Sequence, residues 1–70
     1  MLIRLSDPTL VDDLCESFRR AGFSARSAGG SMAEVERPDA PERDQERREV
    51  ELHLRVWLAM HPDVAAELVD

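Results

Sequence analysis

The chain is organised around one dense apolar block, residues 50–60, which also contains the only tryptophan, Trp57. With a period of two, the block alternates apolar and polar positions as a β-strand does. With a period of 3.6, Val50, Leu54 and Trp57 fall on one stripe of a helix. The preceding residues favour the helix, because residues 42–49 are almost all good helix formers and include no glycine or proline. The strand remains the alternative for this block.

We therefore predict a helix from near Ala40 to Met60. Asp39 is expected to cap it, since a short carboxylate satisfies free backbone N–H groups. Pro41 is tolerated in the first turn, and Glu42 stands three residues after the cap. Pro62 ends the run, because the residue before a proline disfavours helical geometry.

The first part of the chain predicts a short strand followed by a helix. Residues 2–5 alternate in the manner of a strand. Asp7 is placed to cap the helix and Pro8 to occupy its first position. An apolar stripe then recurs at helical spacing as far as Ala21. Gly22 supplies the left-handed residue that commonly ends a helix.

The middle and end of the chain predict three further strands. Residues 23–27 and residues 32–36 both alternate, and Gly29-Gly30 between them predicts the turn of a hairpin. Residues 64–69 fit either a final strand or a short helix. The strand is favoured because the apolar positions alternate.

The order strand, helix, strand, strand, helix, strand predicts an α+β fold, the ferredoxin-like βαββαβ two-layer sandwich, as a single domain over residues 1–70. Its antiparallel sheet would have the first and third strands in the centre and both helices on one face. The side chains predicted to meet in the core are Ile3, Leu5, Leu14, Phe18, Phe23, Ala25, Ala33, Val35, Leu54, Trp57 and Leu58.

The other face of that sheet would lack a covering layer. Its predicted residues are Leu2, Arg4, Ser24, Arg26, Met32, Glu34, Glu36, Ala65 and Glu67. Arg4 and Arg26 are expected to pair with Glu34 or Glu36 across neighbouring strands. A face that mixes apolar side chains with complementary charges suits self-association, so Leu2, Arg4, Met32 and Glu34 form the predicted dimer interface.

Composition narrows the function classes. Seventy residues bury only about 60% of the surface that the unfolded chain exposes, so homodimerisation is a plausible source of additional buried area. One cysteine rules out an internal disulfide and fits a reducing cytoplasm. No apolar run is long enough to span a membrane. The net charge of −6 and the lack of tyrosine argue against nucleic acid as a partner.

Little in the sequence indicates a reaction centre. Cys15, His53 and His61 are the only thiol and imidazole groups, and the eight-residue separation of the histidines does not fit one metal ion. A pair between Cys15 and a histidine is conceivable, but a small apolar role for the thiol is the simpler interpretation. We therefore expect no enzyme activity, no metal and no cofactor. The Gly29-Gly30-Ser31 segment lacks the lysine and the following helix of a phosphate-binding loop.

Two family resemblances follow from these residues. His61-Pro62-Asp63 matches the tripeptide of the J-domain co-chaperones, but it stands near the end of the chain after a helix of mixed charge, unlike that family. The element order, the Asp7-Pro8 helix start and the Ala21-Gly22-Phe23 helix stop resemble the small stand-alone ferredoxin-like domains of bacteria. These include ACT-like regulatory modules and short putative signal-transducing proteins. That resemblance implies a regulatory or assembly role and a dimer.

Two functions remain open. The leading hypothesis is a non-catalytic interaction or regulatory module, a homodimer joined through the open sheet face or an edge strand, with a further protein partner left open. The alternative is an ACT-like domain that binds a small molecule between protomers near Gly29-Gly30. ACT domains place their ligand-binding glycine turn between the first strand and first helix. Here the segment Ser6-Asp7-Pro8 holds that place without glycine.

Overall fold

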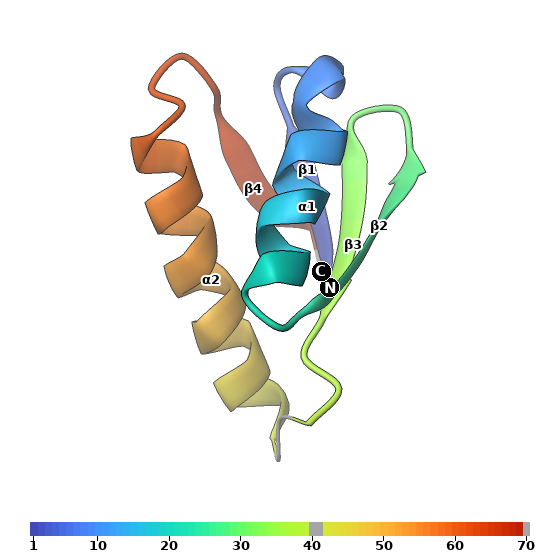
Figure 1. Cartoon of the computed structure of the whole chain (residues 1–70), viewed down its shortest axis with the longest axis vertical. Coiled ribbons are helices and arrows are strands. Elements are labelled where there is room, and N and C mark those ends of the chain that lie inside the picture. The colour runs from blue at the N-terminus through green and yellow to red at the C-terminus, as the bar shows by residue number, and fades with distance from the viewer. Residues whose placement is uncertain (40–41, 70) are drawn as a thin grey trace.

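The computed structural model describes residues 1–39 and 42–69. Its elements are β1 (Leu2–Leu5), a short 3₁₀ helix (Pro8–Leu10), α1 (Val11–Arg20), β2 (Ser24–Gly29), β3 (Met32–Glu36), α2 (Arg43–Ala59) and β4 (Ala66–Val69). The strands form one antiparallel sheet in the order β2-β3-β1-β4, and the two helices form a second layer (Figure 1). The predicted α+β class is confirmed, with the first and third strands in the centre.

The predicted Asp7 cap and Pro8 start are present, but they open a 3₁₀ turn that precedes α1. The carboxylate of Asp7 accepts hydrogen bonds from the backbone N–H of Thr9 at 3.0 Å and from its hydroxyl at 2.6 Å. These bonds hold the pKa of Asp7 below its ordinary value, because they stabilise the charged carboxylate. A 3₁₀ turn comes first, and α1 proper begins at Val11. Gly22, at φ +93°, turns the chain out of the helix.

The apolar block folds as a helix and not as a strand. Residues 50–59 belong to α2, which places Trp57 in the interior with 1% of its surface exposed. The predicted cap at Asp39 is wrong: Glu42 is the capping residue and makes no side-chain capping bond. The Asp39 carboxylate instead lies 3.3 Å from Nε of Arg37. Residues 40 and 41, which include the predicted helix start, lie outside the described residues.

The core lies between the helices and one face of the sheet. It is formed by Ile3, Leu5, Val11, Leu14, Cys15, Phe18, Phe23, Ala25, Ala33, Val35, Val50, Leu54 and Trp57. Ten of the eleven predicted core residues are in this set. The exception is Leu58, which is only partly buried and packs at the margin of the core.

The three later strands that the sequence predicted are also present. Gly29 and Gly30 both have positive φ, +97° and +58°. Gly29 ends β2 opposite Met32, so the turn of the β2–β3 hairpin consists of Gly30 and Ser31, one residue later than predicted. The final segment is a strand, β4, in which Ala66 lies opposite Leu5 of β1. Because side chains alternate along a strand, this register turns Ala66 towards the helices and Glu67 towards the open face.

Candidate functional site

The open face of the sheet is the surface that the sequence predicts to mediate self-association. The β1–β3 register places Leu2 opposite Glu34 and Arg4 opposite Met32. All four side chains point away from the helices, because Ile3 and Ala33 beside them in the chain are fully buried. We call Leu2, Arg4, Met32 and Glu34 the central square. The structure thus brings together all the residues of the predicted interface.

One ion pair on the β2 side of the central square was anticipated. Nη2 of Arg26 lies 2.6 Å from Oε1 of Glu34, and Nε of Arg26 donates to the same oxygen at 2.8 Å. The hydrogen bond to Glu34 raises the pKa of Arg26, since it stabilises the charged guanidinium. The predicted cross-strand pairing of Arg26 is therefore confirmed.

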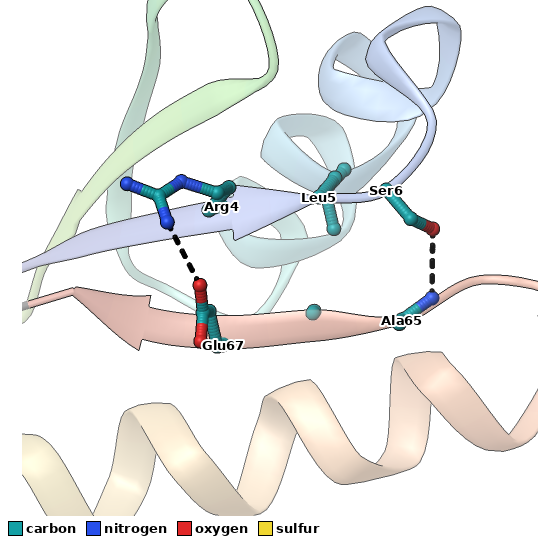
Figure 2. A pocket seen from close by; sticks show the side chains of 6 residues that line it. Arg4, Leu5, Ser6, Ala65 and Glu67 are labelled. Atoms are coloured by element: carbon teal, nitrogen blue, oxygen red, sulfur yellow. Dashed lines mark hydrogen bonds and ion pairs between the residues drawn. The ribbon is translucent and has the colours of Figure 1, made fainter.

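The matching ion pair on the β4 side was missed. Nη1 of Arg4 donates to Oε1 of Glu67 at 2.9 Å, so Arg4 pairs with β4 and not with Glu34 or Glu36 (Figure 2). The two residues are 63 positions apart, and Arg4 lies opposite Glu67 only because β4 pairs with β1. No local sequence signal identifies that partner.

A hollow of about 270 Å³ lies beside this pair (Figure 2). Its lining consists of Arg4, Leu5, Ser6, Ala65, Ala66 and Glu67. The Ser6 hydroxyl accepts a hydrogen bond from the backbone N–H of Ala65 at 2.9 Å, and the backbone N–H of Ser6 donates to Ala65 at the same distance. The polar groups of the hollow thus already bind one another.

The groove between the helices holds the histidines. Nε2 of His53 lies 2.9 Å from the hydroxyl of Ser17, and burial lowers the pKa of His53. Cys15 does not join this pair: it is 1% exposed, and burial raises the pKa of its thiol. A raised pKa leaves the thiol in its weakly nucleophilic form. The hydroxyl of Ser17, not the thiol of Cys15, is the partner of His53, so the Cys–His pair that the sequence left conceivable does not form there.

The second histidine belongs to a network around the tryptophan. The indole N–H of Trp57 donates to Oδ2 of Asp13 at 3.0 Å. The ring of His61 stacks on Trp57 at a centroid distance of 4.0 Å, and Nδ1 of His61 donates to the backbone oxygen of Trp57 at 2.9 Å. Nε2 of His61 lies 3.4 Å from the same Asp13 oxygen. These contacts join the two helices, and no local sequence pattern indicates them.

Both histidines and Trp57 line the groove between the helices. Within residues 1–39 and 42–69, no three side chains of His, Cys, Asp or Glu are grouped so as to hold a metal ion. The groove measures about 550 Å³ and opens to solvent between the helices. Two side-chain hydrogen bonds in this groove, from Trp57 to Asp13 and between His53 and Ser17, connect α2 to α1.

A second exposed surface lies on α2. Among the described residues, the large apolar side chains that are most exposed are Leu52, Val56 and Met60, at 61, 55 and 64%. Their spacing of four residues places them along one stripe of the helix. The three side chains of this stripe are all apolar, whereas the central square of the open sheet face mixes apolar and charged side chains.

Searches of known protein families, curated proteins and solved structures found no match for this chain. Across the part of the chain that the structure describes, no helix has the length and apolar character needed to cross a membrane. The surfaces described above therefore carry the evidence for function.

Proposed function

We propose that this protein is a small, non-catalytic interaction or regulatory module that acts as a homodimer through the open face of its sheet. The observation that carries the proposal is the composition of the central square, in which partly buried Leu2 and Met32 stand beside Arg4 and Glu34. Apolar groups supply association energy, and paired charges restrict the orientation of the partner.

We assign the chain to the ferredoxin-like βαββαβ fold as part of this proposal. The support is the observed element order, with four strands and two α-helices, and the β2-β3-β1-β4 sheet. A sheet covered by helices on one face leaves the other face available to a second copy.

Sedimentation of the purified protein at micromolar concentration tests the proposal. We expect a species of twice the 7.9 kDa chain mass that dissociates on dilution. A 7.9 kDa monomer at every concentration would contradict it.

A small-molecule-binding regulatory domain is the second candidate. The hollow beside Arg4 and Ser6 lies where β1 ends and the turn towards α1 begins. The backbone N–H of Leu5 donates to Ser31 at 2.8 Å, which brings the Gly30-Ser31 turn to the same end of the sheet. A thermal-shift screen with amino acids and nucleotides tests this candidate, because a ligand that binds only the folded state raises the melting temperature. The absence of any shift would count against it.

A further inference from the structure

The central square has a pattern that is complementary to itself. Leu2 lies opposite Glu34 and Arg4 lies opposite Met32 in the β1–β3 pair. The two apolar side chains therefore occupy one diagonal of the square, and the two charged side chains occupy the other. The charged diagonal has one positive and one negative end.

The charges beyond the square extend this pattern. On β2, Arg26 lies opposite Glu34, and on β4, Glu67 lies opposite Arg4. From β2 to β4 the charges are therefore positive, negative, positive and negative. Because this series has an even number of alternating signs, reversing it places every charge over one of opposite sign.

The geometry points to a face-to-face dimer whose two-fold axis runs along the diagonal from Leu2 to Met32. This inference rests on the proposed function, and the occupant it names is a second copy of the chain. Rotation about that axis sets Leu2 against Leu2 of the second copy and Met32 against Met32 of the second copy. The same rotation moves the side chains on one side of this diagonal over those on the other side in the second copy.

Each charged side chain then meets its opposite. Arg4 faces Glu34 of the second copy, and Arg26 faces Glu67 of the second copy. The symmetry repeats both contacts, as an isologous interface requires. The ion pairs within each chain, Arg26–Glu34 and Arg4–Glu67, thus stack head to tail across the interface.

The other simple two-fold axes through the square give poor contacts. An axis parallel to the strands, or one perpendicular to them within the face, places charged side chains over apolar ones. An axis along the charged diagonal sets Arg4 against Arg4 of the second copy and Glu34 against Glu34 of the second copy. Like charges in contact are strongly unfavourable. The apolar diagonal is therefore the axis that satisfies all four positions.

This axis also fixes how the two sheets cross. Neighbouring strands are about 4.8 Å apart and alternate residues about 6.8 Å apart along a strand, so the diagonal lies about 35° from the strands. A two-fold rotation doubles that angle, and the strands of the two sheets would cross at about 70°. Such a crossing is closer to orthogonal than to aligned sheet packing.

A charge-swap experiment tests the inference. Arg4→Glu alone places Glu over Glu34 of the second copy twice per dimer, and Glu34→Arg alone places Arg over Arg4 of the second copy twice. We expect each substitution to raise the dissociation constant of the dimer roughly 100-fold over that of the parent. An equimolar mixture should recover the dimer, because a heterodimer of the two variants restores both contacts with opposite charges. Sedimentation is run at about 0.15 M salt, which screens the repulsion between charges that are more than about 8 Å apart.

The outcomes separate this inference from the function on which it rests. A monomeric parent would contradict the homodimer itself. A dimeric parent whose two variants also stay dimeric, or whose mixture stays monomeric, would uphold the homodimer and overturn the proposed axis. Circular dichroism of each variant checks that the fold persists.

Crosslinking supplies a second measurement that does not alter charge. Leu2→Cys and Met32→Cys each place a thiol on the proposed axis, so a short thiol-reactive crosslinker should join two copies of either variant. Leu52→Cys on the exposed stripe of α2 is the matched control and should not crosslink. Buried Cys15 should leave the parent uncrosslinked. Crosslinking of the control alone would move the interface to α2 and overturn the inference.

Discussion

The two faces of the sheet are built from alternate residues of the same strands, yet they have different properties. Towards the helices, Ile3, Ala33 and Val35 are fully buried and wholly apolar. On the open face, Leu2 and Arg4 of β1 remain partly and largely exposed, and Arg4 forms an ion pair with Glu67. Burial of apolar area drives folding, whereas ordered charge selects a partner. Changes on the helix side should therefore alter stability, and changes on the open side should alter association.

The largest expected effect lies on the helix side. Trp57→Ala removes a side chain that is 1% exposed and its hydrogen bond to Asp13, and should lower the free energy of unfolding by about 3–5 kcal/mol. That loss is comparable to the whole stability of many small domains. Urea denaturation of the parent and the variant measures it. A variant that unfolds at the same urea concentration as the parent would place Trp57 outside the core.

The next prediction concerns the open face. Met32→Asp should weaken self-association roughly 100-fold, because it sets two carboxylates together on the proposed axis. The stability of the monomer should change by less than about 1 kcal/mol, since Met32 lies outside the core. Sedimentation and urea denaturation of one preparation measure the two effects. A large loss of stability with unchanged association would reverse the distinction between the faces.

A smaller effect should appear with pH on the helix side. Burial lowers the pKa of His53 in the folded state, so the unfolded chain binds its proton more readily. The contribution of neutral His53 to stability is complete above about pH 6.5, the ordinary value for histidine, and falls as the pH drops below it. Urea denaturation at several pH values between 5 and 8 measures this slope. His53→Gln should flatten it, and an unchanged slope would assign the pH dependence to another group.

The smallest effect is expected on the exposed stripe of α2. Val56→Ser changes a side chain that is 55% exposed and should alter the free energy of unfolding by no more than about 0.5 kcal/mol. Association should not change, because the stripe lies outside the proposed interface. If this variant loses the dimer while Met32→Asp keeps it, α2 is the interface.

Local patterns in the sequence predicted most of the fold. The side-chain carboxylate of Asp7 marks the start of the 3₁₀ turn that leads into the first helix, and the positive φ of Gly22 marks the end of that helix. Alternation placed the strands. The Arg26–Glu34 pair was also predictable, since a short hairpin fixes which residues lie opposite each other.

Features that depend on distant parts of the chain were not predictable. The pairing of Arg4 with Glu67 requires the β1–β4 register, and the contact of Trp57 with Asp13 requires the packing of one helix on the other. The start of α2 was misplaced because residues 36–49 are polar apart from Ala40 and two prolines, so no apolar period indicates where the helix begins. Asp39 has a capping side chain, but Arg37 binds its carboxylate instead.

Amide NMR spectra recorded during dilution from millimolar to micromolar concentration test the role of the open face most directly. If two copies meet there, the signals of residues 2–5 and 32–36 should shift as the dimer dissociates, while those around Val56 stay in place. Shifts concentrated along α2, or spectra that do not change with concentration, would contradict this account.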